Sequence, residues 1–216
     1  MDIDKLKEEE SLQKKKIMKV ICFGDSITNG GWPGILQTKL NGWDKYRFGV
    51  INKGVNGNTT ANAFDRLDSD VIPNLPGTLL VEFGVNDSNH RPWANVPRVG
   101  IKEYEKNLRE FHRIALQHGG SCIFIVNHLL VPFEGKFLHQ GNGRTYQENI
   151  EPYNDTVRKV ASELNVPTID MPVKLREKNV DLEKFLDIDG VHLTSYGNEV
   201  YAGIVFEELV RIFEKE

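Results

Sequence analysis

The segment KVICFGDSITNGGWPGIL, residues 19–36, changes character twice within a short distance. Its first part, VICF, is an apolar run typical of a strand that is buried on both faces of a sheet. The polar, glycine-rich GDSITNGG follows, and WPGILQTKL then has the composition of a helix. A buried strand, a tight turn and a helix in this order are typical of one unit of a parallel α/β sheet.

The same alternation continues along the chain and predicts the fold class. Short apolar runs rich in Val, Ile and Phe predict strands at 18–23, 48–53, 78–83, 121–126 and 166–170. Helical patterns lie between or after them, at 32–40, 60–72, 101–120, 149–165 and 195–216. We therefore predict an α/β protein with a parallel sheet between two layers of helices.

Length and composition limit the possible functions. The chain has 216 residues and a formal net charge of −4, and we expect a single domain over 18–216. The charged segment 1–17 is expected to be helical or disordered. The chain has no strong basic block beyond Lys14–Lys16, so nucleic acid is not an expected partner.

The sequence also gives expectations about location and redox state. It contains neither a membrane-span-length apolar run nor an apolar secretory signal, so we expect a soluble cytoplasmic protein with no membrane span. The two cysteines, Cys22 and Cys122, lie in strand-like runs and are expected to be buried, reduced thiols. The sequence does not indicate the oligomeric state.

Polar and small residues gather where the predicted strands end. Gly24-Asp25-Ser26 follows the first strand, the segment 54–58 follows the second, and the segment 84–87 follows the third. A fourth group, 187–192, precedes the last helix. Ligands of open parallel sheets bind beyond the carboxyl ends of the strands, so we expect these four segments to meet there.

Together the four segments hold what ester hydrolysis requires. Such a reaction needs a hydroxyl nucleophile, a base within hydrogen-bond reach, a group that orients the base, and donors for the oxyanion. Ser26 can be the nucleophile and His192 the base, with Asp189 orienting the imidazole. The backbone N–H groups of Ser26 and Gly57 and the side-chain amide of Asn86 can form the oxyanion hole.

These segments resemble the SGNH hydrolases, also called the GDSL esterase/lipase family. GDS (24–26), NKGVNG (52–57), GVND (84–87) and DGVH (189–192) match its four blocks in order. The resemblance implies a flavodoxin-like, three-layer α/β/α fold with a five-stranded parallel sheet. It also implies ester hydrolysis through an acyl-enzyme, without metal or other cofactor. The pattern is most similar to the small single-domain acetylesterases and the isoamyl-acetate-hydrolysing esterases.

Several alternatives remain open at this point. Each block alone is typical of an ordinary turn or helix cap, and Asp25 or Asp187 could replace Asp189 as the acid. The expected substrate is a short-chain or acetyl ester of a carbohydrate or small alcohol. A thioesterase or lysophospholipase acting on longer acyl chains would use the same machinery. A non-catalytic carbohydrate-binding relative is the third possibility.

Candidate substrate contacts come from the turns and from two long connections. The connections, 85–99 and 127–143, are expected to border the site, where they could act as lids. Asp25 could contact substrate, although bonding to loop amides is the simpler role for it. The full set of candidate contacts is Asp25, Trp32, His90, Trp93, His128 and Phe133. No histidine pair has the spacing of a zinc site.

Overall fold

The computed structural model describes residues 17–43, 45–131 and 142–215. The expected helical or disordered segment 1–17 lies outside these ranges except for Ile17, which begins the first strand. The expected single domain over 18–216 stays a prediction.

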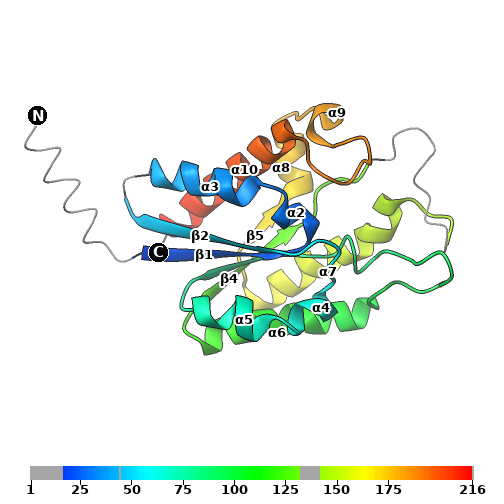
Figure 1. Cartoon of the computed structure of the whole chain (residues 1–216), viewed down its shortest axis with the longest axis horizontal. Coiled ribbons are helices and arrows are strands. Elements are labelled where there is room, and N and C mark those ends of the chain that lie inside the picture. The colour runs from blue at the N-terminus through cyan, green and yellow to red at the C-terminus, as the bar shows by residue number, and fades with distance from the viewer. Residues whose placement is uncertain (1–16, 44, 132–141, 216) are drawn as a thin grey trace, which may run out of the picture.

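Five parallel strands form the sheet, in the order β2-β1-β3-β4-β5 (Figure 1). The strands are β1 Ile17–Gly24, β2 Arg47–Gly54, β3 Thr78–Glu82, β4 Ser121–Val126 and β5 Thr168–Asp170. Strand order reverses between β1 and β3, as in flavodoxin-like sheets. The predicted α/β/α fold with a five-stranded parallel sheet is confirmed.

Helices cover both faces of the sheet (Figure 1). One face carries α3 Trp32–Asn41, α8 Met171–Glu177, α9 Leu182–Phe185 and α10 Ser195–Phe213. The other carries α4 Thr60–Phe64, α5 Leu67–Asp70, the 3₁₀ turn η1 Ile72–Asn74, α6 Ile101–Gln117 and α7 Tyr146–Leu164. Each layer buries its own apolar cluster against the strands, and Cys22 and Cys122 lie buried and free within them, as predicted.

The segment 60–72 does not form the single helix that its pattern predicts. It is divided between α4, α5 and the start of η1, and Arg66 between the first two has a non-helical backbone. The Arg66 guanidinium donates to the carbonyl oxygens of Gly24 (2.9 Å) and Lys53 (2.7 Å), near the ends of β1 and β2. The break between α4 and α5 therefore lies at the residue whose side chain connects this segment to the ends of β1 and β2.

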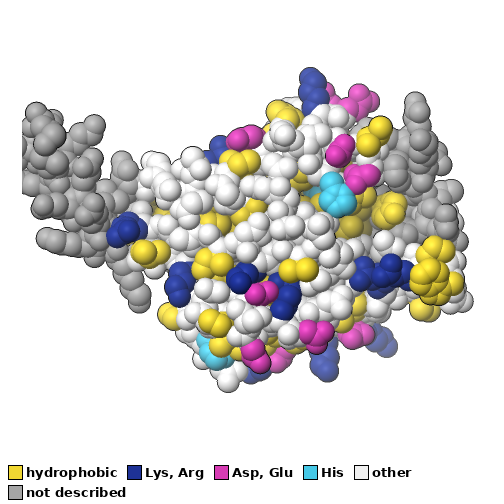
Figure 2. All heavy atoms as spheres, in the orientation of Figure 1, with side chains coloured by type: hydrophobic (Ala, Val, Ile, Leu, Met, Phe, Trp, Pro, Cys, Tyr) yellow, Lys and Arg dark blue, Asp and Glu magenta, His cyan; other side chains and the backbone are white. Residues whose placement is uncertain are grey.

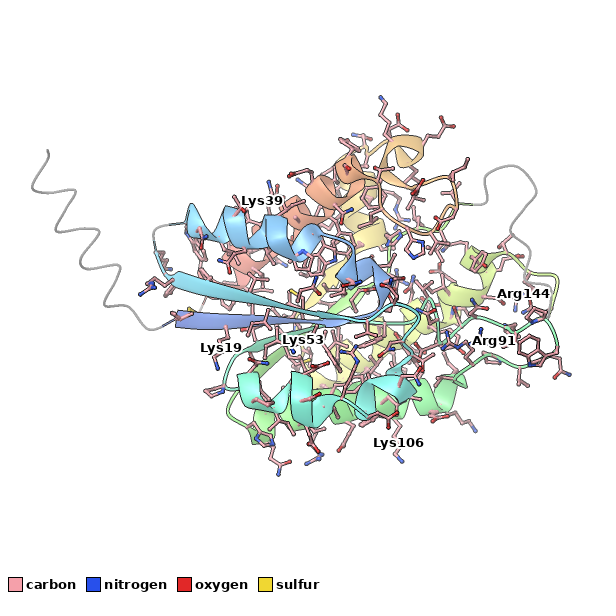
Figure 3. The ribbon with its side chains drawn as sticks, viewed as in Figure 1. Lys19, Lys39, Lys53, Arg91, Lys106 and Arg144 are labelled. Atoms are coloured by element: carbon pink, nitrogen blue, oxygen red, sulfur yellow. The ribbon has the colours of Figure 1, made fainter. Side chains whose placement is uncertain are left out.

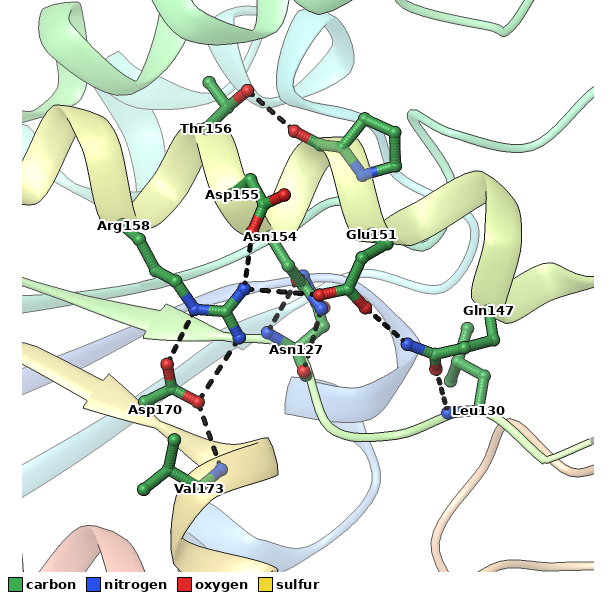
Figure 4. A network of polar contacts seen from close by, with 11 residues as sticks. Asn127, Leu130, Gln147, Glu151, Asn154, Asp155, Thr156, Arg158, Asp170 and Val173 are labelled. Atoms are coloured by element: carbon green, nitrogen blue, oxygen red, sulfur yellow. Dashed lines mark hydrogen bonds and ion pairs between the residues drawn. The ribbon is translucent and has the colours of Figure 1, made fainter.

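A polar network fixes the chain where β4 ends (Figure 4). Asn154 of α7 accepts from the backbone N–H of Asn127 at 3.2 Å, and Gln147 accepts from that of Leu130 at 2.8 Å. Arg158 of the same helix binds Asp170 at the end of β5, at 2.7 Å. The helix therefore holds the segment after β4, which in turn contacts the candidate site.

Within the described part of the chain, no helix combines the length and the apolar character needed to span a membrane.

Candidate active site

The three segments that follow β1, β2 and β3 meet at the carboxyl edge of the sheet, next to the point where strand order reverses. Ser26 starts the short helix α2, Ser26–Asn29, immediately after β1. Glycine is required at position 24, because a Cβ there would lie 2.1 Å from Thr28 Oγ1 and 2.6 Å from the Glu82 carbonyl oxygen. This close approach lets the chain turn sharply and brings Ser26 out of the sheet.

Ser26, His192 and Asp189 form a continuous hydrogen-bonded relay. Ser26 Oγ lies 2.9 Å from His192 Nε2, and His192 Nδ1 lies 2.5 Å from Asp189 Oδ2. The first pair is separated by 166 positions in the sequence. An imidazole protonated on Nδ1 leaves Nε2 free to accept the serine proton, so the arrangement can activate the Ser26 hydroxyl.

The loop that carries His192 is fixed at several backbone positions. Asp187 N–H donates to the His192 carbonyl at 2.8 Å, and Leu186 and Leu193 form an antiparallel bridge. The segment after β4 also contacts this loop, through the buried His128, whose Nε2 lies 2.8 Å from the Val191 carbonyl oxygen. The imidazole of His192 thus projects from an ordered turn.

Asp189 is the carboxylate that faces His192, and Asp187 is not. Partial burial disfavours ionisation of Asp189, but hydrogen bonds from the His192 side chain and from two backbone N–H groups outweigh it and lower its pKa. Asp187 Oδ1 instead accepts from the backbone N–H of Ile188, at 2.7 Å. The geometry therefore favours Asp189 over the alternative acid.

Asn86 has its side-chain amide oriented from both ends. Its Nδ2 donates to Asp25 Oδ2 at 3.0 Å, and its Oδ1 accepts from Arg98 at 3.2 Å. Asp25 also caps α2 by accepting from the Ile27 N–H at 2.9 Å. The amide nitrogen carries two hydrogens, and the bond to Asp25 uses one of them.

Gly57 lies in the turn after β2 in a left-handed conformation, with φ of +74°. A Cβ at this position would meet no atom within 4 Å, so its backbone faces open space. Among the described residues its N–H has no hydrogen-bond partner, while its carbonyl accepts from Arg98 at 2.9 Å. The Gly57 N–H is available to a bound oxygen atom.

Three carboxyl groups in and next to these segments are buried, those of Asp25, Glu82 and Asp87. Burial raises the pKa of Asp25 and of Asp87 to about 6. Burial also raises the pKa of Glu82, and the nearby Asp25 carboxyl adds to this effect. Asp87 accepts from the Thr60 N–H at 2.9 Å and from the Thr60 hydroxyl at 2.5 Å. Asp87 thereby ties the segment after β3 to α4.

Only some of the predicted substrate contacts lie where a ligand could reach them. Trp32 packs in the core against Tyr201, with ring centroids 5.1 Å apart, and both Asp25 and His128 are also fully buried. Burial therefore argues against a substrate contact by any of these three side chains. Trp93 is 82% exposed, and His90 is partly buried beside the Ser88 carbonyl. Phe133 lies outside the described residues.

Arg98 is the site residue that the sequence reasoning missed. It bonds to both Asn86 and Gly57, yet it lies inside the long connection 85–99 and belongs to none of the four blocks. Its position becomes evident only when the connection folds back on itself. The sole sequence signal was a basic residue in a loop expected to border the site.

In the described part of the chain, no group of three or more His, Cys, Asp or Glu side chains is arranged to hold a metal ion.

Comparison with known proteins identifies the family. Residues 22–200 match the model of the GDSL-like Lipase/Acylhydrolase family. The chain belongs to this family. This GDSL hydrolase is accordingly a carboxylic ester hydrolase, and the predicted resemblance is confirmed.

Individual relatives agree with the family assignment. The hydrolase is 25% identical to an acetylxylan esterase of Geobacillus stearothermophilus, over 88% of this chain and 93% of the relative. It is 25% identical to the mouse isoamyl acetate-hydrolyzing esterase 1 homolog, over 84% of this chain and 77% of the relative. A crystal structure of a lipase/acylhydrolase from Enterococcus faecalis has the same fold, with TM-score 0.70, 22% identity and coverage of 89% and 95%.

Proposed function

We propose that this GDSL hydrolase cleaves short-chain carboxylic esters, acetyl esters of carbohydrates or of small alcohols, through an acyl-enzyme on Ser26. The observation that carries the proposal is the relay Asp189–His192–Ser26, with contacts of 2.5 and 2.9 Å. The Asn86 amide donates at 3.0 Å to Asp25, the residue before Ser26, which ties this expected oxyanion donor to the nucleophile's turn. A serine nucleophile, an oriented base and convergent donors are the parts that acyl transfer requires.

In the first half of the reaction, Ser26 Oγ attacks the ester carbonyl carbon while His192 Nε2 takes the hydroxyl proton. The carbonyl oxygen becomes an oxyanion, held by the N–H groups of Ser26 and Gly57 and by the free amide hydrogen of Asn86. Asp189 stabilises the imidazolium that forms. The carbon–oxygen bond to the alcohol then breaks, and His192 returns the proton to the leaving oxygen.

In the second half, water replaces the alcohol. His192 takes a proton from the water, whose oxygen attacks the acyl carbon and forms a second oxyanion at the same donors. Collapse of this intermediate breaks the bond to Ser26 Oγ, which recovers its proton from His192. The products are the free alcohol and the carboxylic acid, and the enzyme is regenerated.

Two observations support a small acyl group on a large or polar alcohol. The side chains of His192 and Asp189 are 48% and 42% exposed, so the leaving-group side of the relay is open to solvent. Trp32 packs in the core and does not line an acyl pocket. The names of the relatives, an acetylxylan esterase and an isoamyl acetate-hydrolyzing esterase homolog, support the same class.

A chain-length series of p-nitrophenyl esters tests the acyl preference. We expect kcat/KM to be highest with the acetyl ester and to fall steadily towards the octanoyl ester, because an open site gives a long acyl chain little surface to bury. A parallel series of acetylated xylose oligomers and isoamyl acetate compares the alcohol parts. A preference for octanoyl or longer esters would contradict the proposal and favour the thioesterase or lysophospholipase alternative.

A further inference from the structure

Arg98 lies between two of the groups that would hold the oxyanion. Its guanidinium donates to Asn86 Oδ1 at 3.2 Å through one terminal nitrogen and to the Gly57 carbonyl at 2.9 Å through the other. Asn86 follows β3 and Gly57 follows β2, so a single side chain connects two separate segments of the site. A guanidinium presents its donors in a rigid planar fork, which fixes the two acceptors relative to each other.

The backbone around Arg98 is firmly held. The connection 85–99 turns back on itself: Arg98 N–H donates to the Asn89 carbonyl at 2.9 Å, and Val99 N–H to that of Asp87 at 3.1 Å. The Val99 carbonyl accepts from the buried Tyr153 hydroxyl at 2.6 Å. These contacts anchor the peptide groups on both sides of the Arg98 Cα, so the side chain that carries the guanidinium starts from a fixed backbone.

The hydrogen bond from Arg98 determines which way the Asn86 side-chain amide is turned. Arginine can only donate, so its partner must be the amide oxygen. The amide nitrogen is then directed towards Asp25, the residue before Ser26. Without Arg98, the Asn86 amide oxygen would lose this hydrogen bond, and the side chain would be held only through its nitrogen.

We propose that Arg98 is a positioning residue, which holds the Asn86 amide and the backbone at Gly57 so that the Asn86 side chain and the Gly57 N–H donate to the same oxyanion. The inference rests on the proposed function, because it assigns Arg98 to that same reaction. Arg98 acts through these two groups and does not itself contact the reacting atoms.

Arg98→Met removes the donors and keeps a long apolar side chain. We expect kcat to fall about 10- to 100-fold, as for other small displacements of catalytic groups, with little change in KM. Arg98→Lys keeps the charge but not the fork, so its kcat should lie between those of the wild type and Arg98→Met. Arg91→Met is the matched control: Arg91, labelled in Figure 3, is an exposed arginine on the same connection 85–99, and this variant should keep wild-type kcat.

A double-mutant cycle with Asn86→Ala separates positioning from a purely structural effect. If Arg98 acts through Asn86, Arg98→Met should cost a smaller factor in kcat in the Asn86→Ala background than in the wild type. An equal factor in both backgrounds, or a wild-type kcat for Arg98→Met, would overturn the inference. Circular dichroism checks folding, and Arg98→Lys replaces Arg98→Met in the cycle if the latter does not fold. An inactive wild type would instead contradict the proposed function, and the inference with it.

Discussion

Asp189→Asn is expected to lower kcat/KM about 10⁴-fold at neutral pH, the loss typical of an acid that sets the histidine tautomer. The asparagine oxygen can keep the two backbone hydrogen bonds that Asp189 Oδ1 accepts, each 2.9 Å long. Its amide nitrogen would then face His192 Nδ1, and two donors cannot face each other. The imidazole would carry its proton on Nε2 and could not accept the proton of Ser26.

Asp187→Asn is the matched control for this experiment. Asp187 lies on the same loop, but its carboxylate accepts from the Ile188 N–H, whereas the Asp189 carboxylate is the one bonded to the His192 side chain. Steady-state kinetics should therefore give this variant near wild-type kcat/KM. A loss of less than about 100-fold for Asp189→Asn, or an equal loss for both variants, would contradict the role of Asp189.

Asn86→Ala is expected to lower kcat about 10²- to 10³-fold with a modest change in KM. The amide hydrogen strengthens its contact only when the carbonyl oxygen acquires charge, so its loss should affect the transition state more than substrate binding. The substitution also leaves Asp25 and Arg98 without their shared partner.

Asn95→Ala is the corresponding control, because Asn95 is exposed on the same connection. Kinetics on p-nitrophenyl acetate should separate the two variants. A near wild-type kcat for Asn86→Ala would remove Asn86 from the oxyanion hole. A rise in KM at constant kcat would assign it to substrate binding instead.

Charged and apolar side chains lie next to each other at the end of the molecule beyond the strands (Figure 2). Trp93 and Val96, on the same connection as Arg98, are 82% and 61% exposed. These side chains belong to the connection predicted to border the site. Their exposure is compatible with contact to the alcohol part of an ester, which the comparison of acetylated xylose oligomers with isoamyl acetate would test.

Much of the fold is predictable because its signals are local. Apolar runs bounded by glycine and polar turns located every strand to within two residues, and β4 matched its predicted range at both ends. The short helices α2, α8 and α9 were missed, since each spans only 4–7 residues and carries little periodicity. For α8 a signal existed: Asp170 caps it and proline follows at 172.

The candidate site also has a part that local sequence patterns predict and a part that only the folded structure shows. The motif blocks were sufficient to predict the candidate site residues Ser26, Gly57, Asn86, Asp189 and His192. The segments that follow parallel strands meet at one edge of the sheet, so their grouping could be expected from the order of the strands. The packing of Trp32 on Tyr201 and the contact of Arg98 with Gly57 join residues more than 40 positions apart in the sequence. Arg98 is only 12 positions from Asn86, but it reaches Asn86 because the connection folds back on itself. Contacts of these kinds have no local pattern, so they require the folded structure.

Covalent labelling of Ser26 tests the central claim most directly. The wild-type protein and Ser26→Ala would be incubated with a fluorophosphonate probe, and the labelled peptide identified by mass spectrometry. An activated serine should react, so we expect the wild type to carry one label, on Ser26, and Ser26→Ala to carry none. An unlabelled wild type, or equal labelling of both proteins, would contradict the assignment of Ser26 as the nucleophile.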